Sequence, residues 1–172
     1  MRKLLLMGLT ILVFSLALTL SGTTRASDGK EDSTVLQFNG MVGVHGPYTG
    51  SSNPIRGING GGISWVLTRA EGKLKADGEL KVEVKGLVLG PDAPANLRGT
   101  NPVPTFKAVV SCQSINEEGQ ASVTNISTKA FPASTTGNAK IEDKVDLPTT
   151  CIAPVIFVVH GTAGAWFAAT GA

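Results

Sequence analysis

Hydrophobic residues alternate with polar residues along most of the chain after residue 33, and a period of two is typical of β-strands with one buried face. The alternation is clearest over residues 139–147, where Ile141, Val145 and Leu147 share one parity and charged residues take the other. Similar patterns predict strands over residues 35–44, 63–67, 106–112, 120–128 and 165–170. Residues 153–160 are apolar on both parities, which predicts a strand buried on both faces.

Two alternating runs flank the dipeptide Asp77-Gly78, and this arrangement predicts a β-hairpin. Asp-Gly is favoured there because both residues tolerate the positive φ angles of a tight hairpin turn. We expect Leu74 on the first arm and Leu80 and Val82 on the second to face the core, and the lysines and glutamates between them to face solvent.

Turn-forming residues separate these strands. Residues 45–54 and 57–62 are rich in glycine, and residues 90–105 contain four prolines, so we expect loops at all three places. About nine short strands joined by turns predict an all-β domain. The expected architecture is an antiparallel two-sheet β-sandwich, immunoglobulin-like or jelly-roll, with about 8–9 strands and one disulfide.

The N-terminal segment has the layout of a secretory signal peptide. Arg2 and Lys3 precede an apolar run over residues 4–20, and a short polar segment with small residues ends at Ala26. We therefore expect a signal peptide over residues 1–26, a flexible leader over 27–33, and a single domain over 34–172 that is secreted to the extracellular space or the periplasm. Because the apolar run approaches the roughly 18 residues that span a bilayer, the alternative is a retained membrane anchor. Contact with a membrane is expected only in that case.

Removal of residues 1–26 would change the charge of the protein. The remaining 146 residues carry 12 Lys and Arg and 13 Asp and Glu, which gives a net charge of −1. The basic residues are scattered rather than clustered, so we expect no nucleic-acid partner.

Cys112 and Cys151 are the only two cysteines of the chain. In an exported protein such a pair predicts a disulfide, and closing this loop would stabilise the fold by about 4 kcal/mol in the chain-entropy model. Both cysteines fall on the expected inward parity, so the bond is expected to join the two sheets or to tie the edge of one.

Candidate catalytic chemistry is sparse in this sequence. His45 and His160 are far apart in the chain, and no motif supplies further metal ligands or a catalytic base, so no metal site, cofactor or catalytic residue is predicted. The expected function is that of a secreted, non-enzymatic module with a binding or structural role at the cell envelope or outside the cell. The alternative is a secreted hydrolase of unrecognised type that uses His45 or His160.

Loops are the expected place for recognition, because the strand faces are accounted for by packing and by solvation. The loop residues with most binding potential are Tyr48, as an amphipathic contact, and Arg56 and Arg98, as forks for an anion. The partner would be an extracellular ligand or protein that the sequence does not identify.

Overall fold

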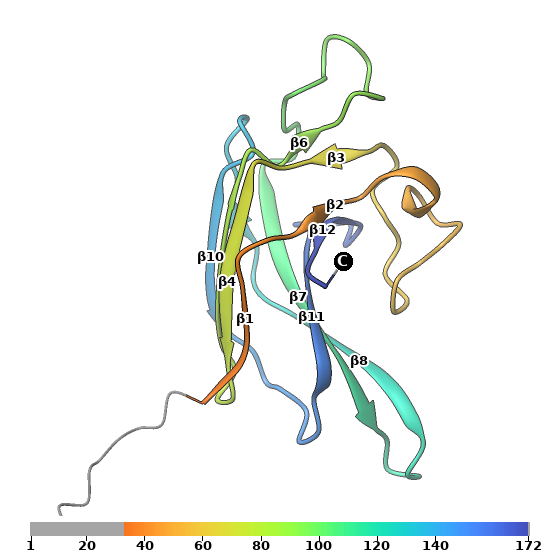
Figure 1. Ribbon diagram of the computed structural model, residues 1–172, viewed down its shortest axis with the longest axis vertical. Coiled ribbons are helices and arrows are strands. Elements are labelled where there is room, and N and C mark those ends of the chain that lie inside the picture. The colour runs from red at the N-terminus through yellow and green to blue at the C-terminus, as the bar shows by residue number, and fades with distance from the viewer. Residues whose placement is uncertain (1–32, 172) are drawn as a thin grey trace, which may run out of the picture. The chain divides into compact units, whose positions relative to one another are not determined.

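The computed structural model describes residues 33–171, and these residues form an all-β structure of twelve strands and one short 3-10 helix (Figure 1). The elements are β1 (Thr34–Phe38), β2 (Val42–Gly43), η1 (Gly46–Tyr48), β3 (Trp65–Val66), β4 (Arg69–Lys75), β5 (Glu79–Lys85), β6 (Val88–Leu89), β7 (Thr105–Ile115), β8 (Ala121–Ser127), β9 (Phe131–Pro132), β10 (Ala139–Lys144), β11 (Ile152–His160) and β12 (Trp166–Ala169). The expected signal peptide over 1–26 and nearly all of the expected leader lie outside the described residues. In the described part of the chain, no helix is long and apolar enough to cross a membrane.

The strands form three antiparallel sheets. Sheet A has the order β1-β4-β5-β10, and sheet B has the order β2-β12-β11-β7-β8 with β9 paired to β7. The third sheet consists of β3 and β6. Figure 1 shows sheet A and sheet B as separate layers, and fully buried side chains from both belong to one hydrophobic cluster. Its fully buried members include Leu74, Leu80, Ile141, Phe106, Val110, Ile156 and Val158.

The strand count is higher than the predicted 8–9, because the chain changes sheets within segments that the sequence pattern joins. Residues 35–44 were expected to form one strand with Val42 buried, and this expectation is wrong. β1 pairs with β4 in sheet A, the chain then bends at Asn39, and β2 pairs with β12 in sheet B. The change of sheet leaves Val42 40% exposed, whereas Val44 is fully buried.

The predicted hairpin is confirmed. β4 and β5 pair in register from Arg69 opposite Lys85 to Leu74 opposite Leu80, and the turn at Ala76–Gly78 joins them. Leu74, Leu80 and Val82 are buried as expected. The turn also contacts the chain just after β10, because the Val145 N–H donates a hydrogen bond to the Gly78 carbonyl at 3.0 Å.

The predicted disulfide between Cys112 and Cys151 is confirmed, with a Cα–Cα distance of 4.8 Å. Its position in the fold differs from both expected positions, between the two sheets and at the edge of one sheet. Cys112 is buried in β7, and Cys151 is half-buried just before β11, which is the neighbour of β7 within sheet B. The bond therefore joins two adjacent inner strands of one sheet rather than two sheets or a sheet edge. It lies where the β7–β11 register shifts between Ile152 and Val155.

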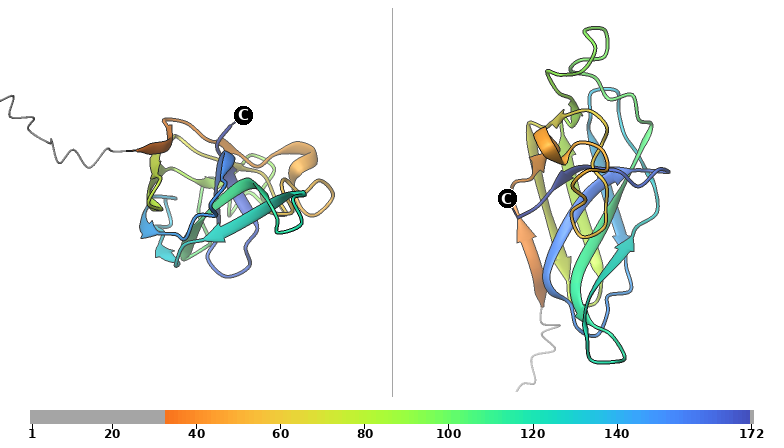
Figure 2. Two further views of the ribbon diagram at one scale, coloured as in Figure 1. Left: turned by 90° about the horizontal axis from the view of Figure 1, so that it is seen from below. Right: turned by 90° about the vertical axis from the view of Figure 1, so that its right-hand side faces the viewer.

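β11 is buried on both faces over Ile156–Val159, as its continuous apolar run predicts. One face packs into the shared core, and the other face is covered by the loop over residues 45–62. Figure 2 shows this loop in front of β7 and β11 when the molecule is viewed from the side of sheet B. The larger sheet therefore has an apolar surface on each side.

Replacing Gly78 with Ala should lower the free energy of unfolding by roughly 2–4 kcal/mol, a loss typical of strained or overpacked sites. Gly78 has a φ of +86°, and an added Cβ would lie 1.9 Å from the Val145 carbonyl oxygen. Gly119→Ala is the matched control, because Gly119 also has a positive φ, +76°, but an added Cβ would meet no atom within 4 Å. Urea unfolding followed by tryptophan fluorescence should show the larger loss for Gly78→Ala, and equal losses would contradict the role of the clash.

Asp143 should make the stability sensitive to acid. Its carboxylate accepts hydrogen bonds from the backbone N–H groups of Lys129 and Lys144, at 2.9 and 3.0 Å, and these bonds lower the pKa of Asp143 below its ordinary value of 3.8. Because the folded pKa is lowered, the stabilisation is complete above about pH 3.8 and is lost as the pH falls through the folded value. Asp143→Asn should cost about 1 kcal/mol at pH 7. The gap between variant and wild type in urea unfolding should close at the acid end, and a gap that does not change with pH would refute this assignment.

Candidate functional site

The loops over residues 45–62 and 90–105 approach each other at one end of the structure. His45 from the first loop lies with Pro91 and Asp92 from the second along one hollow of about 420 Å³. We call this the Ser64 hollow, and it is lined by Met41, Val42, Gly43, His45, Ser64, Trp65, Val66, Leu67, Pro91 and Asp92. Two loops that are far apart in sequence therefore form a common surface.

A second hollow of about 310 Å³ lies on the other side of His45. We call this the Trp166 hollow, and it is lined by Val42, Gly43, His45, Tyr48, Ile55, Val155, Phe157, Trp166, Ala169, Thr170 and Gly171. The rings of Phe157 and Trp166 meet edge to face, with centroids 6.0 Å apart. The lining of this hollow is mostly apolar, as is usual for sites that bind an apolar group.

The indole N–H of Trp166 has no hydrogen-bond acceptor among the described residues, although the side chain is only 4% exposed. A buried donor without an acceptor costs free energy, so nearly all such groups in proteins are paired. This donor belongs to a residue that lines the Trp166 hollow.

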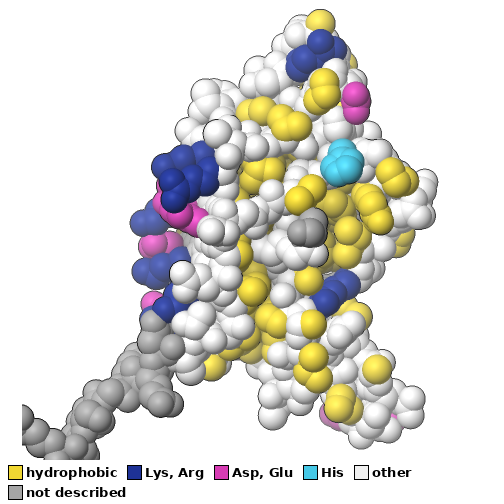
Figure 3. Space-filling view, viewed as in Figure 1, with side chains coloured by type: hydrophobic (Ala, Val, Ile, Leu, Met, Phe, Trp, Pro, Cys, Tyr) yellow, Lys and Arg dark blue, Asp and Glu magenta, His cyan; other side chains and the backbone are white. Residues whose placement is uncertain are grey.

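Three large hydrophobic side chains are exposed around these two hollows. Val42, Tyr48 and Val66 are 40%, 44% and 45% exposed. Figure 3 shows hydrophobic side chains gathered on the face that carries β2 and the C-terminal strand. We define the His45 surface as the two hollows together with Val42, Tyr48 and Val66.

Glycines allow the first loop to lie close to β12 and to the turn that contains η1. Gly61 N–H donates to the Trp166 carbonyl, and an added Cβ at Gly60 would lie 1.9 Å from the Tyr48 carbonyl oxygen. The glycine-rich segment over 57–62 is thus a place of close backbone approach, which positions Tyr48 beside the Trp166 hollow.

The second loop is held by a buried amide. Asn101 is 3% exposed, and its side-chain nitrogen donates to the carbonyls of Val103 and Ser134, at 2.8 Å each. Its side-chain oxygen accepts the Val103 N–H at 2.9 Å. The proline-rich segment is a loop as predicted, and these bonds fix its return to β7.

The three predicted binding residues do not lie together. Tyr48 is exposed on η1 and lines the Trp166 hollow. Arg56 is half-buried, and its guanidinium donates to the carbonyls of Ser111 and Ala153, both at 2.8 Å. Arg98 is exposed within the second loop, where it donates to the Ala93 carbonyl at 3.2 Å. Neither arginine lines the two hollows of the His45 surface, and their binding roles stay predictions.

The two histidines have different surroundings. The Nδ1 atom of His160 lies 3.1 Å from the backbone nitrogens of Thr162 and Ala163, which donate to it, and 3.1 Å from the Thr162 hydroxyl. This nitrogen therefore serves the turn that follows β11. His45 precedes η1 and lies between the two hollows. In the described part of the chain, no group of three or more His, Cys, Asp or Glu side chains is placed to hold a metal ion.

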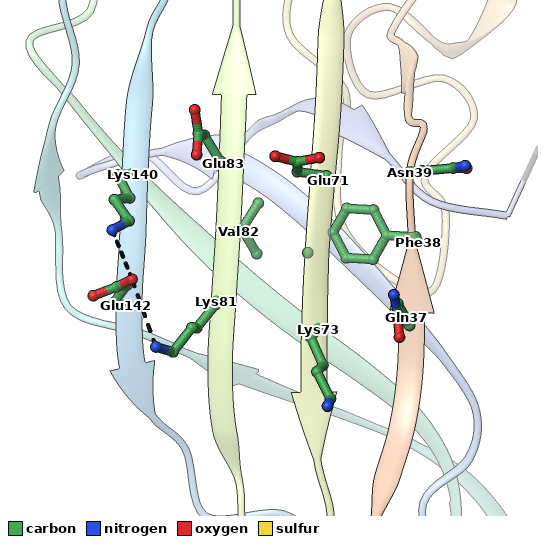
Figure 4. A pocket seen from close by; sticks show the side chains of 11 residues that line it. Gln37, Phe38, Asn39, Glu71, Lys73, Lys81, Val82, Glu83, Lys140 and Glu142 are labelled. Carbon is green, nitrogen blue, oxygen red and sulfur yellow. Dashed lines mark ion pairs between the residues drawn. The ribbon is translucent and has the colours of Figure 1, made fainter. Parts of the chain in front are cut away.

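A groove of about 340 Å³, bordered by charged and polar side chains, crosses the outer face of sheet A (Figure 4). Two rows of side chains border it. The lysine row is Gln37, Lys73, Lys81 and Glu142, and the glutamate row is Asn39, Glu71, Glu83 and Lys140. Phe38, Gly72 and Val82 lie between the rows. A hydrogen bond from Lys140 lowers the pKa of the Glu142 carboxyl and raises that of Lys140.

The chain matches no protein-family model, and neither the curated proteins nor the solved structures show a significant similarity to it.

Arg56 should contribute to stability, because it holds the first loop on the outer face of sheet B. Its φ of +51° is unfavourable for a residue with a side chain, and the Asn125 side-chain amide donates to its carbonyl at 2.9 Å. Arg56→Ala should lower the free energy of unfolding by about 1.5–3 kcal/mol, since two hydrogen bonds from a charged donor are lost. Arg56→Lys keeps the charge but loses the planar fork, so it should restore only a small part of the loss in urea unfolding. Full restoration by lysine would show that charge alone matters.

Proposed function

We propose that this protein is a secreted, non-enzymatic binding module whose His45 surface receives an apolar group from an extracellular ligand or a protein partner. The observation that carries the proposal is the Trp166 hollow, which combines an apolar lining, an exposed rim at Val42 and Tyr48, and a buried indole donor that has no acceptor among residues 33–171. An apolar group that also carries a hydrogen-bond acceptor would suit both features.

Two further observations support this assignment. The Cys112–Cys151 disulfide is compatible with an oxidising location such as the extracellular space or the periplasm. The antiparallel sheets A and B contribute side chains to one hydrophobic cluster, which supports a β-sandwich of the immunoglobulin-like or jelly-roll kind. The Trp166 hollow lies between the loop over residues 45–62, which is a common kind of place for recognition, and the strands β2, β11 and β12 of sheet B, so a loop and a sheet face share this site.

No specific observation favours the alternative of a hydrolase that uses His45 or His160. A nucleophilic mechanism needs a base held by a third group beside the nucleophile. His160 Nδ1 accepts two backbone N–H donors in its turn, which is an arrangement that stabilises the turn.

Binding of small probes, followed by two-dimensional NMR, tests the proposal. N-acetyl-phenylalanine amide combines an apolar ring with amide acceptors, and methyl β-glucoside is a polar comparison of similar size. We expect the phenylalanine derivative to shift the Trp166 indole N–H and the backbone amides of Gly43 and Gly171, which line the Trp166 hollow. Tyr48→Ser should weaken this binding at least about fivefold, because an exposed aromatic contact is lost.

Val123→Ser is the matched control, since Val123 is 47% exposed on β8 and does not line the Trp166 hollow. It should leave the probe affinity unchanged. The proposal is wrong if the shifts map to the groove of sheet A, or if neither probe shifts the residues of the His45 surface.

A further inference from the structure

The edge strands of sheets A and B differ in how they are protected against pairing with another chain. Natural edge strands are short, charged or irregular, because their free backbone groups can template a further strand. In sheet A, β10 has charged residues at four of its six positions, and β1 has a register shift between Thr34 and Leu36. In sheet B, β2 and β9 have two residues each. The remaining edge strand of sheet B is β8.

β8 has none of these protective features. It spans seven residues, Ala121–Ser127, and contains neither a charged residue nor a proline. It pairs with β7 without a register shift. Figure 1 shows the β7–β8 hairpin extending away from sheet A at the lower end of the molecule. β8 is therefore a long, uncharged and regular edge.

Two hydrogen bonds show which backbone groups of β8 point away from β7. Just beyond one end of β8, Thr128 N–H donates to the Ala108 carbonyl at 2.9 Å. Just beyond the other end, Asn116 N–H donates to the Gln120 carbonyl at 2.9 Å. Because bonded and non-bonded positions alternate along an antiparallel pair, the even-numbered residues of β8 bond to β7 and the odd-numbered residues face the free edge. Within residues 33–171, no backbone hydrogen bond is made by the N–H and C=O groups of Ala121, Val123, Asn125 and Ser127.

We propose that this edge pairs with the same edge of a second copy of the chain, in the antiparallel direction, about a two-fold axis through Thr124. Val123 then lies opposite Asn125 of the partner subunit, and Ala121 lies opposite Ser127 of the partner subunit. The symmetry forms each pair twice, and each pair exchanges two backbone hydrogen bonds. This register gives every outward backbone group of β8 a partner, whereas an axis through Val123 would place Ser127 beyond the end of the partner's strand.

The two ends of β8 carry unlike charges, which favours a second copy in this orientation. Glu117 and Glu118 lie in the turn before β8, and Lys129 follows its end. Antiparallel pairing brings the acidic turn of each copy toward Lys129 of the partner subunit, and no like charges meet along β8. Lys129 also lies 3.6 Å from Asp143 in its own chain, so the pairing depends on the backbone groups and the end charges only favour its direction.

The side chains of β8 fit the same register. Thr124 meets Thr124 of the partner subunit, and threonine pairs are favourable across antiparallel strands. Val123 is 47% exposed, and it would lie diagonally beside Val123 of the partner subunit. The pairing thus covers part of an exposed hydrophobic side chain.

The interface is small. Seven residues at about 3.3 Å each, in a layer about 10 Å thick, give an area on the order of 200 Å² per copy. Stable complexes bury about 800 Å² per partner, so this dimer is weak and forms at high protein concentration. Its affinity comes mainly from backbone hydrogen bonds, as in other cases of strand addition to a sheet edge.

Hydrogen exchange of single backbone amides, measured by NMR on the purified wild type, tests the pairing without any substitution. Raising the protein concentration from about 50 μM to about 1 mM should slow the exchange of the Val123 and Asn125 amides about threefold or more, because the monomer fraction falls. The amides of Ser122 and Thr124 bond to β7 and are the internal control. Their protection should be the same at both concentrations.

Val123→Pro removes one outward N–H and leaves the bonds between β7 and the even-numbered residues in place, so it should fold and stay monomeric in sedimentation equilibrium. Val123→Ser is the matched control, because it changes the side chain and keeps the N–H. It should dimerise with a Kd within about threefold of the wild-type value, since the backbone bonds carry the affinity.

Thr124→Lys and Thr124→Glu test the position of the axis. An axis through Thr124 places each introduced charge directly opposite its own copy, so each variant alone should be monomeric. A mixture of the two should form a heterodimer, because the opposed charges are then unlike. Thermal melting shows whether each variant is folded, and the exchange data on the wild type decide the proposal if one is not.

Three outcomes would overturn the proposal: a wild type that stays monomeric at about 1 mM, the upper end of weak affinities, a Val123→Pro variant that still dimerises, or a dimer that leaves the exchange of the odd-numbered amides unchanged. A Thr124→Lys and Thr124→Glu mixture without heterodimer would also exclude this axis. β8 lines neither hollow of the His45 surface, so failure here leaves the probe-binding result unaffected.

Discussion

Three aromatic rings pack together where the small third sheet meets sheet B. Trp65 of β3 stacks on Phe167 of β12, with ring centroids 3.9 Å apart, and Phe106 of β7 meets both rings edge to face. Trp65 belongs to the small third sheet, whereas Phe106 and Phe167 belong to sheet B. Aromatic pairs contribute about 0.5–1.5 kcal/mol beyond the area that they bury. The His45 surface depends on this contact, because β3 carries Val66 at its rim and is held on sheet B by Trp65.

The cluster also constrains the backbone beside it. An added Cβ at Gly61 would lie 3.1 Å from both Phe167 and Trp65, so the glycine leaves room for the stacked rings. Gly61 also donates its N–H to the carbonyl of Trp166, whose ring lies on the opposite side of sheet B from Phe167. One short segment of the first loop therefore touches both the central cluster and the candidate site.

Sequence patterns predicted the local structure better than the connections between sheets. The Asp77-Gly78 hairpin and the doubly buried β11 follow from local alternation and turn chemistry, and both are confirmed. The change of sheet at Asn39 has no such signal, because residues 35–44 keep one parity while the chain leaves sheet A. The predicted position of the disulfide, between the two sheets or at a sheet edge, was wrong for a related reason. The parity of a residue shows which face of a strand it occupies, but it does not show which strand is the neighbour.

The candidate site shows the same division. The exposure of Tyr48 could be predicted from its turn-rich loop, and Tyr48 is exposed. The role of Arg56 in holding the loop on sheet B could not be predicted from the sequence. Its acceptors, the carbonyls of Ser111 and Ala153, come near Arg56 only when the loop folds over sheet B. Trp166 was missed because an apolar strand near the end of the chain suggests only core packing, and a donor without an acceptor is visible only in three dimensions.

The charged face of sheet A was interpreted from sequence as a solvated surface, and alternation alone supports that interpretation. The register of the strand pairs shows which residues are neighbours across the strands, which alternation does not show. In the β4–β5 pair, lysine lies opposite lysine and glutamate lies opposite glutamate. The opposition is offset within the chain, because Glu71 pairs with Arg69 and Glu83 pairs with Lys85 along their own strands, and Lys81 pairs across to Glu142 on β10. Exposed pairs of this kind contribute little each, so the face is explained by many weak local contacts that alternation in the sequence does not reveal.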